Sequence, residues 1–235
     1  MIKLDNCIKK YSNVTALNHV SLEIKQGEFA YLIGPSGAGK TTLIKLLTCE
    51  EKVTTGSLKM GNVDLPRLQD SQIPEFRRQL GVVPQDFFLL ESLTIYQNLV
   101  YVLRAIETKR KLIKEKALRA LNEVGMLEYK HLFPKELSVG QRQKVAIARA
   151  IVNEPKILLA DEPTGNLDNK SAIEVMKILY QLNQKGTTIL MATHNSTIVN
   201  TIRYRVLEIN KGQIIRDQDK GSYGRWNDHR DVFVI

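Results

Sequence analysis

Cysteine is scarce in this chain, where Cys7 and Cys49 are the only two among 235 residues. They lie far apart in the sequence and form no CxxC pair, which argues against a disulfide scaffold and against a cysteine-based zinc site. We expect both thiols to behave as small, buried apolar side chains. Aromatic residues are also few, at 6% of the chain, and they are not interleaved with basic residues as single-stranded nucleic-acid binding would favour. We therefore expect no nucleic-acid partner.

The sequence also lacks long apolar runs. No stretch approaches the roughly 20 consecutive apolar residues of a membrane-spanning helix, and the start lacks the basic and then apolar order of a signal peptide. We therefore expect a cytoplasmic protein. The chain does have an excess of positive charge, with 34 Lys and Arg against 25 Asp and Glu. This excess favours anionic partners such as a nucleotide or the inner face of a membrane, although a solvated basic surface gives the same balance.

Short β-rich runs alternate with segments of helical period, which predicts an α/β fold built on a mainly parallel sheet. Apolar runs at residues 29–33, 157–160 and 187–193 are the strand candidates, and each is followed by a polar or glycine-containing turn. Ligands gather at such turns in open α/β sheets. Residues 206–209 and 213–215 flank the turn Asn210-Lys211-Gly212 and predict a hairpin.

Helical signals dominate between about residues 86 and 155. Thr94 and Gln97 form a capping box, which predicts a helix through Leu99 and Ile106. A second amphipathic helix is expected over 113–124, ended by Gly125. The basic run Lys109-Arg110-Lys111 between them is expected to be a solvated loop.

The chain is therefore expected to be a single domain with a helical lobe inserted into an α/β core. The core comprises about 1–85 and 156–215, the lobe about 86–155, and a polar tail 216–235. In the tail, Arg225, Trp226 and Arg230 could touch lipid headgroups or a partner, although a frayed terminus is the simpler expectation.

A phosphate-binding motif, GxxxxGK[ST], lies between the strand at 29–33 and a helical segment. Its glycines let the backbone wrap around phosphates, and the helix N-terminus adds partial positive charge. Lys40 is expected to reach the β- and γ-phosphates, and the Thr41 hydroxyl to bind Mg²⁺. The sequence thus predicts binding of a nucleoside triphosphate with Mg²⁺. The candidate nucleotide contacts here are Gly34, Pro35, Ser36, Gly37, Ala38, Gly39, Lys40, Thr41 and Thr42.

Two carboxylates follow the apolar run at 157–160. Asp161 is suited to hold Mg²⁺, and Glu162 to accept a proton from an attacking water. Adjacent strand residues face opposite sides, so both acids can approach one site only at the end of the strand. A base beside the metal, with no motif for a second substrate, favours a hydrolase over a kinase.

A second capping box joins Ser138 to Gln141 and opens a helix with a buried stripe. The segment is either simply a well-capped helix or a second anion site, in which the Ser138 hydroxyl and the Gly140 backbone approach a phosphate. Such a site has no strong cation of its own. It would fit a γ-phosphate held on the phosphate loop of another subunit.

In their order, these motifs resemble the ATP-binding cassette of ABC transporters over nearly the whole chain. Residues 34–41 are similar to the Walker A loop, 137–141 to the LSGGQ signature, 157–162 to Walker B and 166–168 to the D-loop. Gln85 resembles the Q-loop glutamine, a catalytic and Mg²⁺-binding position, and His194 resembles the catalytic switch histidine. Tyr11 stands where the family stacks an aromatic ring on adenine.

The resemblance implies a P-loop ATPase core with an N-terminal antiparallel β part and the inserted helical lobe. It also implies ATP hydrolysis by a head-to-tail homodimer, in which two ATP lie between the phosphate loop of one subunit and the signature of the other. An integral membrane partner would hold the protein at the inner face of the membrane. Residues 87–90, two Phe and two Leu, are either an apolar seat for that partner or part of the lobe's core.

Several stretches, including 27–34, 191–206 and 216–224, are similar to family members that act in bacterial cell division. A lipoprotein-releasing or macrolide-type exporter stays the alternative, and a nucleic-acid-associated cassette a more distant one. One position departs from the family, because Val139 replaces the first glycine of the signature. Its β-branched side chain restricts the backbone and adds bulk, so we expect a working but weaker closed dimer.

Overall fold

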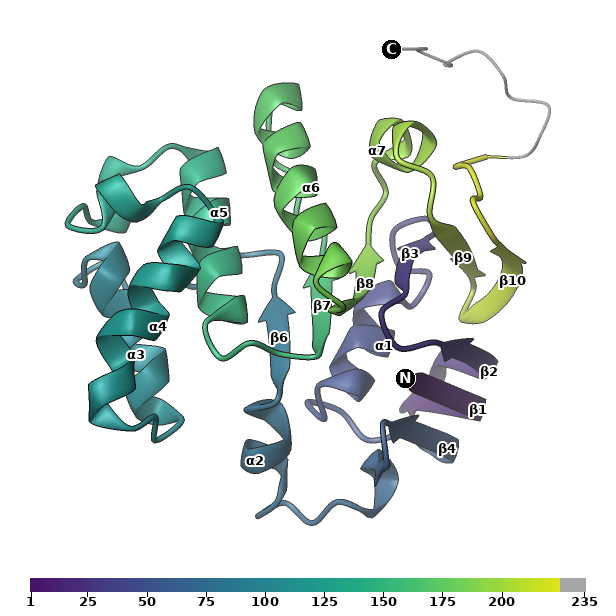
Figure 1. Cartoon of the computed structure of the whole chain (residues 1–235). Coiled ribbons are helices and arrows are strands. Elements are labelled where there is room, and N and C mark those ends of the chain that lie inside the picture. Colours follow the sequence, from purple (N-terminus) through teal and green to yellow (C-terminus); the bar gives the residue numbers. More distant parts are fainter. Residues whose placement is uncertain (225–235) are drawn as a thin grey trace. The chain divides into compact units, whose positions relative to one another are not determined.

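The computed structural model describes residues 1–224 and divides into two compact units (Figure 1). One unit comprises Met1–Arg77 together with the chain from Thr188 onward, and the other comprises Arg78–Thr187. The tail residues Arg225, Trp226 and Arg230 lie outside the described part of the chain. Within residues 1–224, no helix combines the length and the apolar character needed to cross a membrane.

The first unit begins with an antiparallel sheet, which confirms the N-terminal β part implied by the family resemblance. Its strands lie in the order β2–β1–β4–β5. They are β1 (Ile2–Tyr11), β2 (Val14–Ile24), β4 (Thr55–Met60) and β5 (Val63–Asp64). Hydrophobic periodicity alone did not indicate β1 and β2, because their pairing shifts register around Asn6 and His19. Both residues have left-handed φ, of 49° and 54°, so the apolar alternation breaks within each strand.

The other four strands of this unit lie side by side in the order β10–β9–β3–β8. They are β3 (Phe29–Ile33), β8 (Thr188–Ala192), β9 (Arg205–Asn210) and β10 (Gln213–Gln218). β3 runs parallel to both β8 and β9. Every residue of β3 and β8 is buried, as expected for continuous apolar strands of a parallel sheet. The unit also contains α1 (Lys40–Leu47), α2 (Ile73–Arg77), α7 (Ser196–Thr201) and a 3₁₀ turn at Leu65–Arg67.

β9 and β10 form the predicted hairpin. Lys211 and Gly212 have φ of 46° and 76°, the two consecutive positive values of a type I′ turn. β10 runs three residues further than expected, to Gln218. The extension is held by Arg216, whose guanidinium donates to Glu208 of β9 at 2.8 Å.

The second unit contains two parallel strands and most of the helices. These elements are β6 (Leu80–Val83), β7 (Ile157–Asp161), α3 (Ile95–Ala105), α4 (Arg110–Glu123), α5 (Val139–Ile151), α6 (Asn169–Gln184) and 3₁₀ turns at Leu127–Tyr129 and Pro134–Glu136. Figure 1 shows α3, α4 and α5 packed together, and all three lie in the segment expected to be helical. Both predicted capping boxes are formed, at Thr94 and at Ser138.

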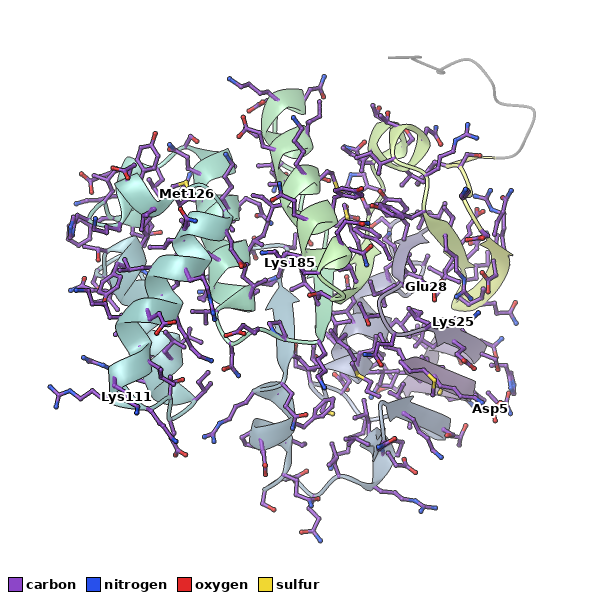
Figure 2. The ribbon with its side chains drawn as sticks, viewed as in Figure 1. Asp5, Lys25, Glu28, Lys111, Met126 and Lys185 are labelled. Carbon is purple, nitrogen blue, oxygen red and sulfur yellow. The ribbon has the colours of Figure 1, made fainter. Side chains whose placement is uncertain are left out.

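The basic run between α3 and α4 was predicted wrongly as a loop. Lys109 is the N-cap, and Arg110 and Lys111 already belong to the first turn of α4. Figure 2 labels Lys111 at this end of the helix, where its side chain is exposed. Cations at a helix N-terminus oppose the macrodipole, which is why the charge pattern argued against a helix start here.

Gly125 ends α4 as expected. Its φ is 69°, and its N–H donates to the Asn122 carbonyl at 3.0 Å while the N–H of Met126 donates to the Leu121 carbonyl at 2.8 Å. These two bonds form a Schellman motif, which satisfies carbonyls at the end of the helix.

The two cysteines differ. Cys7 is fully buried, and its Sγ donates to the Ser57 carbonyl at 2.9 Å. Burial raises the pKa of its thiol. Cys49 is only partly buried, so the expectation of two buried thiols was wrong for it. It lies in the turn after α1, with a left-handed φ of 57°.

A buried asparagine on α3 organises the turn that precedes this helix. Asn98 is 1% exposed. Its Oδ1 accepts from the Leu90 N–H at 2.8 Å, and its Nδ2 lies 3.1 Å from the carbonyl oxygens of Leu90, Leu93 and Thr94.

We predict that Asn98→Ala lowers the free energy of unfolding by about 2 to 4 kcal/mol, because several buried backbone groups lose their partner. Urea unfolding measures the change. Asn122→Ala on the exposed face of α4 is the matched control, with an expected change within about 0.5 kcal/mol. Equal effects of the two substitutions would contradict the organising role of Asn98.

Candidate functional site

The phosphate loop connects β3 to α1, as the motif predicted. Gly34 and Gly39 have φ of 150° and 113°, a region that glycine enters without steric cost. A Cβ at Gly34 would lie 2.1 Å from the carbonyl oxygen of Ile209, and one at Gly39 would lie 2.7 Å from that of Ala16. These glycines are therefore required both by the backbone conformation and by the close packing behind the loop.

The turn of the β9–β10 hairpin supports the phosphate loop from behind. The N–H of Gly212 donates to the Ala38 carbonyl at 2.9 Å, and the Gly212 carbonyl accepts from the N–H of Asn18 at 2.8 Å. One residue of the turn thus joins the loop to β2. Sequence reasoning found this turn but not its contact with the loop, because the partners lie far apart in the chain.

Lys40 is the first residue of α1 and is 9% exposed. Its Nζ donates to the carbonyl oxygens of Gly34 at 2.8 Å and of Pro35 at 3.2 Å, so the ammonium group is held over the loop. Thr41 and Thr42 follow in the first turn of α1, where backbone N–H groups have no acceptor within the helix. The loop therefore combines a cation with the N-terminal end of a helix, as an anion site requires.

Two other predicted residues belong to the same unit. His194 is exposed two residues after β8, next to Thr193, whose N–H donates to the Leu32 carbonyl of β3 at 3.1 Å. Because β3 and β8 are parallel, His194 and the phosphate loop leave the same edge of the sheet. Tyr11 ends β1 with 37% of its surface exposed, and the Nζ of Lys9 lies 4.7 Å from its ring centroid. The Lys9 ammonium group thus lies over one face of this ring.

The two carboxylates lie in the second unit, at the end of β7. Asp161 is its last residue and is 7% exposed. Glu162 follows with a left-handed φ of 50°, a conformation that costs a residue with a side chain about 1 to 2 kcal/mol. The N–H of Gly165 donates to the Glu162 carbonyl at 3.1 Å and holds the turn. This turn ends the alternation of the strand directly after Asp161, as the prediction of two acids approaching one site requires.

Gln85 leaves the neighbouring strand at the same edge. β6 and β7 are parallel, with Val83 paired to Ala160, so Gln85 and the two acids follow the carboxyl ends of adjacent strands. Gln85 is exposed.

The segment after Gln85 is held by Arg149 of α5, a residue that sequence reasoning missed. Its guanidinium donates to the carbonyl oxygens of Phe87, at 2.7 Å, and of Phe88. Phe88 has a left-handed φ of 46° and is 67% exposed, whereas Leu89 is 8% exposed. The core interpretation of residues 87–90 therefore holds for Leu89 and is wrong for Phe88 and Leu90, which face outward.

The signature segment opens α5. The Ser138 hydroxyl accepts from the Gln141 N–H at 3.2 Å, and Gln141 Oε1 accepts from the Ser138 N–H at 2.9 Å. Val139 is 39% exposed, while Gly140 is buried. The Val139 side chain thus stands at the surface of the helix N-terminus, where the anion site was predicted.

The residues predicted to hold Mg²⁺ fit this ion in kind. Thr41 supplies a hydroxyl, Asp161 a carboxylate and Gln85 an amide oxygen, and hard oxygen donors are the ligands that Mg²⁺ prefers. Within residues 1–224, no cluster of three or more His, Cys, Asp or Glu side chains could hold a metal without help.

We predict that Gly212→Ala weakens nucleotide binding by at least about threefold, although residue 212 lies outside every motif. A Cβ there would lie 2.7 Å from the Ala16 carbonyl oxygen and would displace the turn that holds Ala38. Titration with a fluorescent nucleotide measures the affinity. Gly61→Ala is the matched control, because Gly61 also has a positive φ of 58° but its Cβ would meet open space. An equal loss in both variants would assign the effect to backbone strain alone.

Comparison with known proteins agrees with the geometry of these motifs. The family model described as ABC transporter matches residues 17–165. The cell division ATP-binding protein FtsE of Streptococcus pneumoniae serotype 2 is 48% identical over 225 residues, covering 95% of this chain and 98% of that protein. FtsE of Bacillus subtilis is 46% identical over 228 residues, covering 97% and 100%.

A solved structure extends the similarity to the fold. The dimeric, post-hydrolysis state of the ATP-binding cassette MJ0796 bound to ADP and Pi matches with a TM-score of 0.85 at 33% identity, covering 95% of this chain and all of that one. Sequence, fold and phosphate loop agree, and the chain belongs to the ABC transporter family as one of its ATP-hydrolysing cassettes.

Proposed function

We propose that the chain is the ATP-binding and ATP-hydrolysing subunit of a membrane complex of the FtsE–FtsX type, which regulates cell-wall hydrolysis during cell division. The observation that carries the proposal is the phosphate loop, with its left-handed glycines and with Lys40 held over them at the start of α1. The similarity to FtsE proteins over nearly the whole chain supports the biological role.

In hydrolysis, a water oxygen attacks the γ-phosphorus while the bond to the oxygen bridging the β- and γ-phosphorus breaks, and ADP and phosphate leave. Glu162 orients this water and accepts its proton. Lys40 exchanges the loop carbonyls for β- and γ-phosphate oxygens, so its charge moves to where negative charge is concentrated. His194 and Gln85, which follow the carboxyl ends of their strands, position the γ-phosphate and the water.

Thr41, Asp161 and Gln85 would hold Mg²⁺, which neutralises phosphate charge when bound. Tyr11 would stack on the adenine ring. The partial exposure of Tyr11 supports this role.

The active assembly in this proposal is a homodimer with ATP bound. The capped N-terminus of α5, with Ser138, Gly140 and Gln141, contacts the γ-phosphate that the phosphate loop of the other subunit holds. Hydrolysis removes this shared ligand and reopens the dimer. The match to a cassette whose structure is described as dimeric with ADP and Pi supports this arrangement.

The membrane partner would contact the segment after Gln85. Phe88 exposes 67% of its surface and Leu90 exposes 38%, and a strained backbone that displays a large apolar side chain is typical of functional surfaces. Through this partner the protein would act at the inner face of the membrane.

We predict that Glu162→Gln keeps ATP binding and lowers the hydrolysis rate by at least about 100-fold, because the amide cannot accept the proton from water. The ATP-bound dimer then accumulates. Phosphate release and size-exclusion chromatography measure the two effects. Lys40→Ala is the contrasting variant, since it should weaken nucleotide binding itself. A Glu162→Gln protein that hydrolyses ATP at the parent rate would remove Glu162 from the role of base.

The partner is identified by purifying tagged Glu162→Gln protein from its native membrane with Mg-ATP present, followed by mass spectrometry. Recovery of an integral membrane protein with a large extracellular loop, together with a wall hydrolase, supports the proposal. Recovery of an exporter permease with a lipoprotein or a periplasmic adaptor would replace the biological role and leave the site chemistry as described.

We predict that Val139→Gly strengthens the ATP-dependent dimer by at least about twofold, because it removes an exposed side chain from the helix end that approaches phosphate. Analytical ultracentrifugation in the Glu162→Gln background measures the dimer. Val139→Ala separates bulk from backbone freedom. Dimer affinities that match the parent in both variants would show that crowding at this position is not limiting.

A further inference from the structure

The backbone conformation of Gly140, the second residue of α5, does not explain why this residue is glycine. Its φ is not positive, and in a helix alanine is favoured over glycine by about 1 kcal/mol. A neighbour explains the glycine instead. A Cβ at this position would lie 2.5 Å from the Oγ and 2.8 Å from the Cβ of Ser171, a residue of α6 in the same unit.

Rotation of the serine side chain cannot relieve this contact. The Ser171 Oγ could turn away, but the Cβ of Ser171 is fixed by the helix backbone, and 2.8 Å is far below a normal separation of two carbon atoms. Any side chain at position 140 therefore pushes the N-terminal turns of α5 and α6 apart. The close approach of the two helices requires glycine at this position.

Ser171 also holds Asp168, the N-cap of α6. The Ser171 N–H donates to Oδ1 of Asp168 at 2.9 Å, and its hydroxyl donates to Oδ2 at 2.8 Å. Both carboxylate oxygens are thus fixed by one residue. These hydrogen bonds hold the pKa of Asp168 below its usual value, so the group stays charged at neutral pH.

A second contact joins the same two helices one turn further along. The ammonium group of Lys144 on α5 forms an ion pair with Glu174 on α6, and the Lys144 side chain is only 18% exposed. The N-terminal parts of α5 and α6 are therefore held together by two contacts, one helical turn apart.

We infer that Ser171 is a positioning residue that joins the signature turn of α5 to the Asp168 loop, so that the two move as one body. The inference rests on the proposed function, in which the signature turn meets the nucleotide of the other subunit. Gly140 then has a second role besides the approach to phosphate. Because it lacks a side chain, α6 packs closely against the start of α5 and so determines where Ser138 and Gln141 lie.

The test adds a side chain at position 140 of α5 and removes the one at position 171 of α6, singly and together. Gly140→Ala should lower kcat and weaken the ATP-dependent dimer by at least about tenfold, since the added methyl group displaces the signature turn. Ser171→Gly removes the obstructing Cβ together with the hydroxyl, and it should cost only a few-fold by itself. The double variant should regain most of the loss and come within about threefold of Ser171→Gly.

Lys170→Gly is the matched control, because it weakens the same turn of α6 without opening space beside residue 140. Lys170 is exposed and precedes Ser171. Combined with Gly140→Ala, it should restore nothing. Each variant is also tested for thermal unfolding and for binding of ADP to the single subunit, and we expect ADP affinity to stay within about twofold of the parent because the phosphate loop is unchanged.

Restoration by Ser171→Gly but not by Lys170→Gly supports the positioning role. A double variant as inactive as Gly140→Ala, while still folded and binding ADP, would overturn it and would show that the phosphate alone demands the glycine. Full activity of Gly140→Ala would also overturn it. A parent chain that binds ATP but forms no ATP-dependent dimer would instead overturn the proposed dimer, and this inference with it.

Discussion

The hydrogen bond from the N–H of Gly212 to the Ala38 carbonyl fixes the phosphate loop to the β9–β10 hairpin, and the anion site formed by this loop and the start of α1 depends on this support. On its two sides the backbones of Ile209 and Ala16 come so close that only glycine fits at positions 34 and 39. A loop fixed in this way presents its backbone N–H groups with little reorganisation, which favours phosphate binding. The β9–β10 hairpin thus stabilises a loop that lies more than 170 positions earlier in the chain.

The residues proposed for the chemistry beyond phosphate binding all lie at or just after the ends of parallel strands. His194 follows β8 beside the phosphate loop in one unit, and Gln85 and the two acids follow β6 and β7 in the other. The left-handed conformation of Glu162 costs free energy in the folded state. The catalytic role proposed for Glu162 offers an explanation for this cost, because the turn places its carboxylate directly after Asp161.

Each end of α5 contacts a segment that the proposed function uses. Its first turn carries the signature residues and meets α6 through Gly140, and near its last turn Arg149 holds the carbonyls of Phe87 and Phe88. Burial lowers the pKa of Arg149, yet its donors are matched by backbone acceptors, which offsets the cost of desolvation. In the proposed function, α5 would connect the exposed Phe88, where the membrane partner is proposed to bind, to the signature turn that is proposed to meet the nucleotide.

The sequence by itself determined the features that arise from neighbouring residues. The motif of the phosphate loop, the capping boxes at Thr94 and Ser138, and the hairpin turn at Gly212 are each recognised from residues a few positions apart, so their spacing is visible in the chain. Hydrophobic periodicity did not indicate β1 and β2, whose bulges break the apolar alternation. The predictions for the basic start of α4 and for the partly buried Cys49 were wrong. Only the tertiary structure showed three further contacts. Gly212 holds the phosphate loop, Arg149 binds the carbonyls of Phe87 and Phe88, and Ser171 leaves no space for a side chain at Gly140. Their partners lie far apart in the chain, and contacts at such separation leave no periodic trace in a sequence.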